Sequence, residues 1–174
     1  VEACVLEVYA ARNQPGLHVE NRLWLSLFGL ACWDIIFSPV PGAFQHPFQR
    51  GPLDLHRPSF RQQREALFVE RLEAIAQDRW REAMIETFEQ KYGIADAFVR
   101  WEWLTRELLE ELLAVIPGAH LAAVFDRLSR DIRRYRRGFP DLFLFDPEQK
   151  SYQLIEVKGP GDQLRPEQSA WLNY

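Results

Sequence analysis

The sequence is poor in cysteine and in long apolar runs, and each shortage excludes a class of protein. Its 174 residues include two cysteines, Cys4 and Cys32, which form no CxxC pair and lie in apolar surroundings of helical spacing. We expect both to be reduced core thiols, which indicates an intracellular protein of the bacterial cytoplasm or the eukaryotic nucleus. No stretch reaches the roughly 18 consecutive apolar residues of a membrane-spanning helix.

The chain also lacks an excess of positive charge. Its formal net charge of -4 counts against a module whose only role is to bind nucleic acid. Its four histidines are too scattered for a zinc motif, and His18 reads as a loop histidine. With 47% hydrophobic residues, the chain can bury the core of one domain. It does not begin with methionine, and residues 166–174 read as a helix without a stop signal, so we expect a piece of a longer protein.

Apolar residues at helical spacing dominate the chain up to residue 137, where the pattern changes. This spacing predicts helices at about 2–12, 19–33, 60–76, 78–91, 102–116 and 118–136. Prolines and glycines make 38–59 irregular, which is a long loop for a compact domain. Residues 142–145 and 152–157 are short aromatic and β-branched runs around a turn, and they predict a β-hairpin.

The predicted hairpin brings two acids and a lysine together. A loop at 147–150 pairs Asp146 with Ser151, and counting back along both strands sets Asp141 opposite Glu156. Directly opposite Cβ atoms lie about 4.5–5.5 Å apart, so both carboxylates can reach one hard cation such as Mg²⁺ or Mn²⁺. Lys158 lies two residues after Glu156 and therefore shares its face of the strand.

Two acids and a lysine at this spacing predict a metal-dependent site that cleaves phosphodiesters. The cation would polarise the scissile phosphate. Lys158 would either orient the attacking water or neutralise charge on the phosphate, and the sequence leaves both roles open. The alternative is a surface hairpin with ordinary charges, because Glu-x-Lys on a strand is common. A slip of one residue in register would move Glu156 and Lys158 to the other face.

Several motifs resemble a known nuclease pattern. Pro140-Asp141, Glu156-Val157-Lys158 and Gln168-x-x-Trp171 resemble the PD-(D/E)xK pattern in its virus-type replication-repair nuclease (VRR-NUC) form. More closely, the chain is similar to the Fanconi-associated nuclease family over about 16–174. The motifs that carry this likeness are Gly138-x-Pro140-Asp141, Glu156-Val157-Lys158-Gly159-Pro160-x-Asp162, Leu30-x-x-Trp33-Asp34-Ile35-Ile36-Phe37 and Pro52-Leu53-Asp54-Leu55.

The resemblance implies an α/β fold that is helix-rich overall. A restriction-endonuclease-like core would carry the site on the hairpin, with a loop and helices inserted at about 38–137, and 1–174 would form one nuclease domain. The implied activity is structure-specific cleavage of branched DNA, chiefly 5′ flaps, with 5′-to-3′ exonuclease activity and a role in interstrand crosslink repair. Branched or crosslinked DNA and upstream DNA-binding domains of the parent chain would be its partners, and we expect a monomer.

The resemblance also assigns site residues. The family's four catalytic positions fall on Glu20, Asp141, Glu156 and Lys158. One or two Mg²⁺ or Mn²⁺ ions would be held by Glu20, Asp141 and Glu156 together with the backbone carbonyl of Val157. Without the resemblance, Glu20 would read only as an acid in the first turn of a helix, where the helix dipole favours it.

Six arginines form the one basic cluster and lead directly into the hairpin; they stand at 127, 130, 133, 134, 136 and 137. We expect Arg133, Arg134 and Arg137 to contact DNA phosphates, which would offset the negative net charge locally. The alternative is a solvated helix face. Gln168, in the first turn of the last helix, is expected to contact the site or a phosphate.

Two other functions are consistent with the same motifs. One is a Holliday-junction resolvase, which would act as a dimer; the helical insertion would obstruct such pairing. The other is a module of the same fold that binds branched DNA without cutting it. The complete set of acids at 20, 141 and 156 favours the cleaving enzyme.

Overall fold

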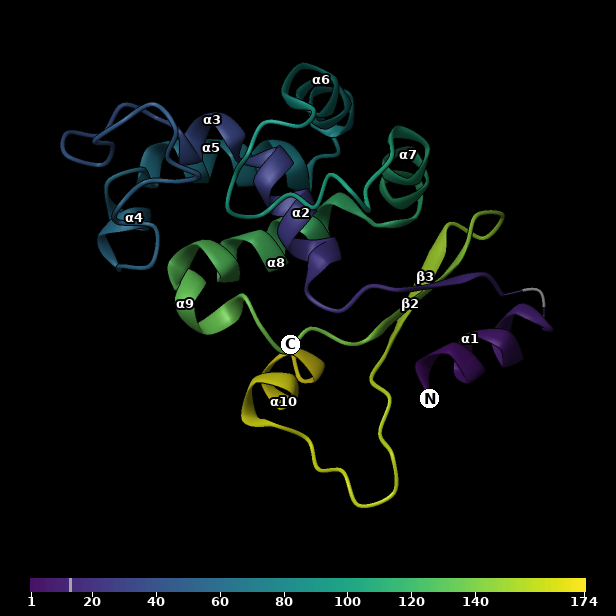
Figure 1. Cartoon of the computed structure of the whole chain (residues 1–174). Helices are drawn as coiled ribbons and strands as arrows, with labels where there is room; N and C mark the ends of the chain where they lie inside the picture. Colours follow the sequence, from purple (N-terminus) through teal and green to yellow (C-terminus); the bar gives the residue numbers. More distant parts are fainter. Residues whose placement is uncertain (13) are drawn as a thin grey trace.

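A body of helices and an antiparallel sheet lie side by side in the computed structural model, which describes residues 1–12 and 14–174 (Figure 1). Among these residues the sheet has three strands, in the order β1 (Gly16–His18), β2 (Leu142–Asp146) and β3 (Ser151–Ile155). The helices are α1 (Glu2–Ala10), α2 (Arg22–Ala31), α3 (Trp33–Ile36), α4 (Ser59–Gln62), α5 (Glu65–Ala76), α6 (Arg81–Lys91), α7 (Arg106–Val115), α8 (Gly118–Arg130), α9 (Ile132–Tyr135) and α10 (Pro166–Leu172). The predicted helix-rich α/β class is confirmed.

Helix boundaries differ from the predicted ones where side chains cap the backbone. The helix predicted at 118–136 is α8 and α9, because the Asp131 side chain accepts the N–H of Arg134 at 3.0 Å and starts a new helix. Similarly, α7 begins at Arg106 because Thr105 caps it through the N–H of Leu108. The region 38–59, predicted to be irregular, contains no helix or strand before α4 begins at its last residue.

Helix α2 is the centre of the helical body. Every residue from Leu23 to Ala31 is buried. The ring of Phe28 has its centroid 6.4 Å from that of Phe68 on α5, 5.2 Å from Phe98 and 5.7 Å from Phe125 on α8. Apolar residues on nearly all sides of one helix are explained by this position, because neighbouring elements cover each of its faces.

The two cysteines occupy different environments, and both are free thiols. Cys32 is buried, as expected, and burial raises the pKa of its thiol to about 12. Cys4 is exposed on α1, so the prediction that it belongs to the core is wrong. No single helix among the described residues is long and apolar enough to cross a membrane, although α7 and α8 reach that composition as a pair bent by 105°.

Strand β1 is absent from the sequence-based prediction, and it is the element that ties the N-terminal part of the chain to the hairpin. Its residues pair antiparallel with β2, with Leu17 opposite Phe143 and His18 opposite Leu142. Gly16 allows this approach, since a Cβ there would collide with the side chain of Leu144. The sheet therefore has β2 at its centre rather than being a hairpin alone.

The hairpin has the predicted register. Asp146 pairs with Ser151 and Leu142 with Ile155, so the next pair outward sets Asp141 opposite Glu156. The side chain of Asp146 closes the loop by accepting the backbone N–H groups of Glu148 and Gln149, each at 3.0 Å. A short polar loop with this cap fixes the register from within the hairpin itself.

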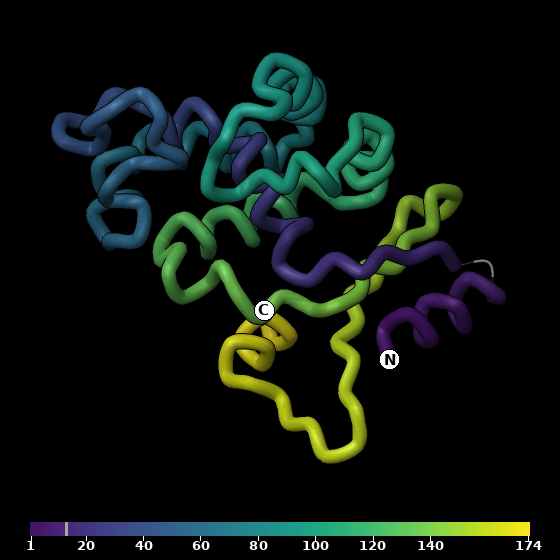
Figure 2. Tube along the Cα trace, in the orientation of Figure 1, coloured from purple at the N-terminus to yellow at the C-terminus, as the bar shows by residue number. Residues whose placement is uncertain are grey.

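After β3 the chain leaves the sheet through a long loop and returns as α10 (Figure 2). Helix α10 is anchored by Trp171, whose ring stacks on Phe139 with centroids 4.1 Å apart. The indole N–H of Trp171 also faces the carbonyl oxygens of Tyr135, at 3.2 Å, and Arg137, at 3.1 Å. The segment that precedes Asp141 is thereby fixed to α10.

Candidate active site

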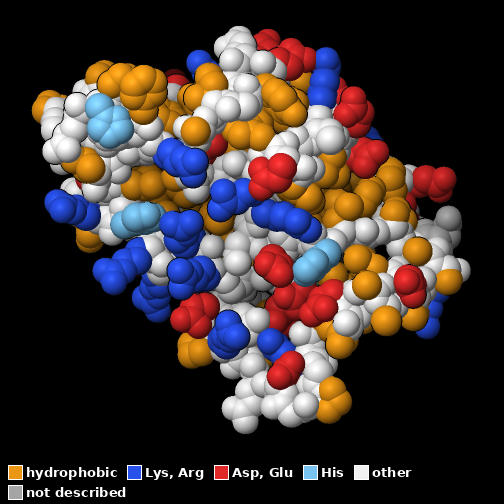
Figure 3. Space-filling view, viewed as in Figure 1, with side chains coloured by type: hydrophobic (Ala, Val, Ile, Leu, Met, Phe, Trp, Pro, Cys, Tyr) orange, Lys and Arg blue, Asp and Glu red, His pale blue; other side chains and the backbone are white. Residues whose placement is uncertain are grey.

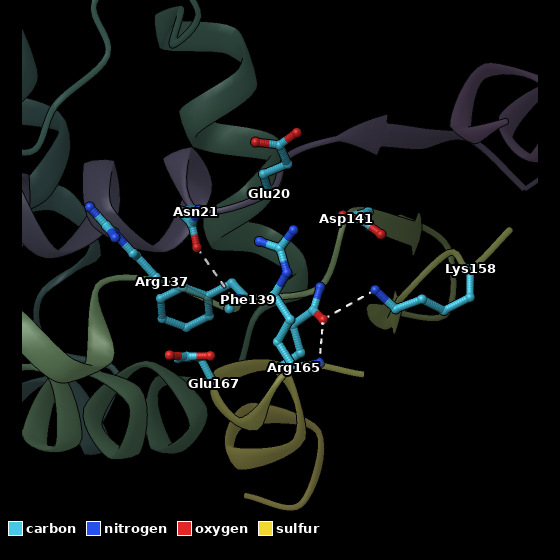
Figure 4. Close-up of a pocket in the computed structure, with 10 residues that line it drawn as sticks. Glu20, Asn21, Arg137, Phe139, Asp141, Lys158, Arg165 and Glu167 are labelled. Carbon is cyan, nitrogen blue, oxygen red and sulfur yellow. Dashed lines mark hydrogen bonds between the residues drawn. The ribbon is translucent and has the colours of Figure 1, made fainter. Parts of the chain in front are cut away.

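A cavity of about 480 Å³ lies where the turn after β1, the start of β2, the loop after β3 and α10 meet (Figure 4). Ten residues line it: Glu20, Asn21, Arg137, Gly138, Phe139, Asp141, Lys158, Arg165, Glu167 and Gln168. The cavity therefore brings together three of the four predicted catalytic side chains and two of the predicted DNA contacts. The fourth catalytic candidate, Glu156, has a side chain that is only 4% exposed and contacts Lys158.

Backbone hydrogen bonds hold Glu20 beside Asp141, although the two are far apart in the sequence. The N–H groups of Val19 and Glu20 donate to the carbonyl oxygen of Asp141 at 2.8 and 3.2 Å. Glu20 adopts a φ of 45°, in the left-handed region, so it does not lie in the first turn of a helix as predicted. Helix α2 begins only at Arg22, because the chain first has to turn out of β1.

The carboxylate of Glu20 is nevertheless directed away from that of Asp141 (Figure 4). It is 58% exposed and lies 3.3 Å from the imidazole of His18, which belongs to β1 rather than to a loop. Asp141 accepts the N–H of Val157 at 2.9 Å. In the part of the chain that the structure describes, no three acid, histidine or cysteine side chains converge closely enough to hold a metal ion. The predicted three-carboxylate cluster is thus only partly assembled.

Glu156, Lys158 and Gln168 form a compact polar group at the wall of the cavity. The ammonium of Lys158 lies 2.8 Å from Glu156 Oε1 and donates to Gln168 Oε1 at 3.1 Å. The amide nitrogen of Gln168 donates to the same oxygen of Glu156. The other carboxylate oxygen, Glu156 Oε2, is buried and has no partner among the described residues. A buried oxygen without a donor is costly, and a cation would satisfy it.

The available donor atoms suit a hard divalent cation. Asp141 and Glu156 follow directly on the last pair of the hairpin ladder, and carboxylate oxygens such as theirs are the ligands that Mg²⁺ and Mn²⁺ prefer. Glu20 is exposed enough to turn from His18 toward them, and its backbone already contacts Asp141. The residues present therefore fit such an ion on donor type and on the unpartnered oxygen of Glu156.

The arginine cluster divides into two groups. Arg127 and Arg130 interact within the protein. The guanidinium of Arg127 lies 4.3–4.8 Å from the ring centroids of three aromatic residues, Tyr135, Trp171 and Tyr174. Arg130 forms an ion pair with Asp126 at 2.8 Å. Arg127 therefore stabilises the contact of α8 with α9 and α10, whereas Arg130, whose side chain is 63% exposed, is paired with an acid one turn earlier on the same helix.

The second group faces solvent. Arg133 and Arg134 are exposed on α9, and Arg137 lines the cavity. A guanidinium nitrogen of Arg136 lies 3.5 Å from the ring of His56. Burial, with Arg136 and Arg133 nearby, lowers the pKa of His56 and favours its neutral form. Figure 3 shows Lys and Arg side chains gathered on this face, beside a group of acidic side chains.

Other basic residues near the site carry no signal in the sequence. Arg165 lines the main cavity, and it does not belong to any of the motifs found in the sequence. A second cavity of about 260 Å³ lies on the other side of Glu20, with Arg22 and Arg100 among its lining residues. Arg100 is brought there by tertiary packing of a loop between α6 and α7, where its N–H donates to Ser26 on α2. Such long-range placement leaves no local pattern to find.

Comparison with known families gives a match to the VRR-NUC domain over residues 75–174. The chain is 46% identical to the Fanconi-associated nuclease 1 homolog of Pseudomonas aeruginosa over 179 aligned positions, which are 99% of this chain and 32% of that protein. It is 36% identical to the Arabidopsis thaliana homolog, covering 99% of this chain and 20% of that one. The human Fanconi-associated nuclease 1 is 33% identical over 90% of this chain and 16% of its own length.

Solved structures give the same result. The chain resembles the crystal structure of paFAN1 bound to DNA with a 2-nucleotide 5′ flap and a gap, with a TM-score of 0.93 and 46% identity. The corresponding complex with a 1-nucleotide 5′ flap gives a TM-score of 0.92. In both, the match covers 99% of this chain and 32% of the other. The chain thus spans between 16% and 32% of the length of these relatives, and the predicted likeness to Fanconi-associated nucleases is confirmed.

Proposed function

The chain belongs to the VRR-NUC domain family, and we propose that it is the nuclease domain of a structure-specific DNA nuclease that cleaves 5′-flapped DNA with Mg²⁺ or Mn²⁺. The observation that carries the proposal is the hairpin, whose register sets Asp141 opposite Glu156 at the edge of a cavity that also contains Lys158. The likeness to a protein crystallised with 5′-flap DNA supports the substrate class. Residues 1–174 would act as one domain in which 38–137 are inserted.

One or two Mg²⁺ or Mn²⁺ ions would be held by Asp141, Glu156, Glu20 and the carbonyl oxygen of Val157. When bound, such an ion supplies Lewis-acid polarisation of the scissile phosphate and a water of lowered pKa. Lys158, 30% exposed beside Glu156, would orient the attacking water or neutralise charge on the phosphate. Its contact with the buried Glu156 supports this role, because it holds the ammonium at the cavity wall.

Basic side chains would hold the DNA. Arg137 and Arg165 line the cavity and would contact phosphates near the scissile bond. Arg133 and Arg134 extend this basic surface along α9. A local basic surface of this kind lets a chain of net charge -4 bind a polyanion.

The finer parts of the proposal follow from the relatives. An action in DNA interstrand crosslink repair, with 5′-to-3′ exonuclease activity beside flap cleavage, is part of the proposal because the chain is similar to Fanconi-associated nucleases. The enzyme would work as a monomer, with upstream DNA-binding domains, in the bacterial cytoplasm or the eukaryotic nucleus. The free state of Cys4 and Cys32 is compatible with a reducing compartment.

The test is cleavage of a labelled 5′-flap duplex in Mg²⁺ by the protein and by its Asp141→Ala and Glu156→Ala variants. We expect each variant to lose more than about a hundredfold in rate, since even outer-shell partners of a metal cost up to that much. Calorimetric titration with Mn²⁺ should show a parallel loss of binding. EDTA should abolish cleavage, and added Mn²⁺ should restore it.

Glu148→Ala is the matched control, because Glu148 is an exposed acid in the loop of the same hairpin. It should cleave and bind Mn²⁺ like the unchanged protein. Equal cleavage by all three proteins and the control would defeat the assignment of the site. DNA binding without cleavage in the unchanged protein would instead favour the binding module.

A further inference from the structure

The side-chain amide of Gln168 links the two charged groups of the site. We propose that Gln168 is a positioning residue that orients Glu156 and Lys158, rather than a residue that contacts DNA. The inference rests on the proposed nuclease function, and it assigns to α10 a direct part in the geometry of the site. Three hydrogen bonds and one aromatic stack carry it.

All three hydrogen bonds of Gln168 are directed at its neighbours in the site. Its oxygen accepts from the ammonium of Lys158 at 3.1 Å and from the backbone N–H of Arg165 at 2.9 Å, as the dashed lines in Figure 4 show. Its nitrogen donates to Glu156 Oε1. The amide has one orientation that satisfies these partners, because the reverse would set an NH₂ group against an ammonium and an N–H.

The position of the amide is fixed by the helix that carries it. Trp171 lies one turn after Gln168 and stacks on Phe139, with ring centroids 4.1 Å apart. Phe139 is two residues before Asp141. The indole N–H of Trp171 is also 3.1 Å from the carbonyl oxygen of Arg137. The stacking of Trp171 on Phe139 therefore sets the distance between the segment that contains Asp141 and the helix that carries Gln168.

A neutral amide suits the chemistry of this position. It donates to a carboxylate and accepts from an ammonium without changing the net charge of the site. The side chain of Glu156 is 4% exposed, so each donor it has offsets part of the cost of burying its polar oxygens. Lys158 keeps the oxygen of Gln168 as an acceptor when the oxygens of Glu156 are given to a cation. The lysine then stays at the cavity wall instead of swinging into solvent.

The hydrogen bonds within the site give the side chain of Gln168 a role that needs no contact with DNA. The prediction from sequence left it between the site and a phosphate. Its oxygen already has two donors, and its nitrogen is directed at Glu156. A phosphate could be reached only by the second hydrogen of this amide nitrogen, since the other three positions are used within the site. Arg137 and Arg165, which line the same cavity, are better placed for that role.

The experiment compares Gln168→Met with Gln163→Met. Methionine preserves the length of the side chain and removes its hydrogen bonds. Gln163 is an exposed glutamine in the preceding loop and serves as the control. For Q168M we expect kcat on the 5′-flap duplex to fall about 10–100-fold with KM unchanged, and Mn²⁺ affinity by calorimetry to fall about tenfold, in the range of outer-shell partners. Q163M should match the unchanged protein in all three.

Unchanged kcat and Mn²⁺ affinity in Q168M would overturn the proposal, and so would a raised KM with unchanged kcat, which indicates a DNA contact. If Q168M melts well below the unchanged protein in EDTA, its loss of kcat could come from unfolding, and the Gln168→Asn variant is then measured instead. Asparagine keeps an amide one methylene shorter, and a folded Q168N with full kcat and Mn²⁺ affinity would overturn the proposal. Failure of the unchanged protein to bind Mn²⁺ would instead count against the nuclease function itself.

Discussion

The helical body and the sheet differ in what their buried groups do. The largest fully buried side chains include Trp24, Phe28, Phe68 and Phe125 in the helical body, whereas the sheet contributes Phe143. All four predicted catalytic side chains lie in the sheet region or in the segments that flank its strands. The helices therefore supply most of the apolar burial that stabilises the fold, and the predicted catalytic side chains belong to a thin sheet that packs against them.

Two buried charged side chains illustrate the difference. Arg64 in the helical body is 1% exposed, and its guanidinium donates to Asp54 at 2.8 Å and to the carbonyl oxygens of Ile35 and Phe60, each at 3.1 Å. Glu156 in the sheet region keeps one buried oxygen without a partner among the described residues. The helical body also has an unpartnered buried carboxylate oxygen, Oδ2 of Asp96, but Glu156 contacts two residues of the candidate cavity, where a cation could satisfy its free oxygen.

The largest expected effect is on stability, from Trp24→Ala. Trp24 on α2 is 1% exposed and lies 6.0 Å from Phe139 and 6.4 Å from Tyr152, centroid to centroid, so it joins the two regions. Removing it should cost about 3–5 kcal/mol of unfolding free energy, as for other buried aromatic side chains. Urea unfolding measures this loss. In the fraction that remains folded, Mn²⁺ affinity should also fall.

Phe68→Ala is the comparison, because its ring neighbours Phe28 and Phe60 belong to the helical body alone. It should destabilise the protein by a similar amount and leave Mn²⁺ affinity in the folded fraction unchanged. Equal effects of both variants on Mn²⁺ affinity would contradict the separation of the two regions. It would mean that the helical core and the site respond as one unit.

A smaller effect is expected at the contact of α10 with the segment before β2, from Gly138→Ala. Gly138 has a φ of 88°, and a Cβ there would lie 2.6 Å from the backbone carbon of Glu167. The left-handed conformation alone costs a non-glycine residue roughly 1–2 kcal/mol. The collision would in addition displace α10, and with it Gln168. The backbone strain should lower the melting temperature, and the displacement of α10 should lower kcat.

Gly93→Ala separates these two costs. Gly93 has a φ of 77°, but a Cβ there would meet nothing within 4 Å. Its melting temperature should fall only because alanine is strained at a positive φ, and its kcat should be unchanged. If Gly138→Ala kept full kcat despite its lower stability, the close approach of α10 would have no part in the chemistry.

The sequence predicts local geometry well and long-range contacts poorly. The register that sets Asp141 opposite Glu156 follows from a short loop and a period of two, both of which are local. Strand β1 has three residues and no alternating pattern, so its pairing with β2 is specified only by the fold. The left-handed turn at Glu20 depends on that pairing, since the carbonyl oxygen of Asp141 accepts its N–H.

The same limit applies to the polar contacts of the site. Gln168 and Trp171 are evident in the sequence as two residues on one helix face. The bonds from Gln168 to Glu156 and Lys158 form only because Trp171 stacks on Phe139 from another part of the chain. The resemblance to a nuclease family assigned the charged residues of the site, but a motif does not report which side chains hold them in place.

The smallest expected effect tests whether the helical surface binds DNA while the sheet region cuts it. Replacing Arg133, Arg134 and Arg137 together by alanine should weaken binding of 5′-flap DNA. The slope of log K against log salt should decrease by about 0.9 for each phosphate that the variant no longer neutralises. Arg133 and Arg134 lie on α9, away from the hairpin, so kcat at saturating DNA should change far less than it does in Asp141→Ala.

Arg130→Ala is the control for this prediction, because Arg130 belongs to the same cluster but is paired with Asp126. Its replacement removes one positive charge and should leave the salt slope nearly unchanged. Fluorescence anisotropy at several salt concentrations measures both variants. An unchanged slope in the triple variant would mean that these arginines are a solvated face. DNA would then be held mainly by cavity residues such as Arg165 and Lys158, and binding and cleavage would share the sheet region.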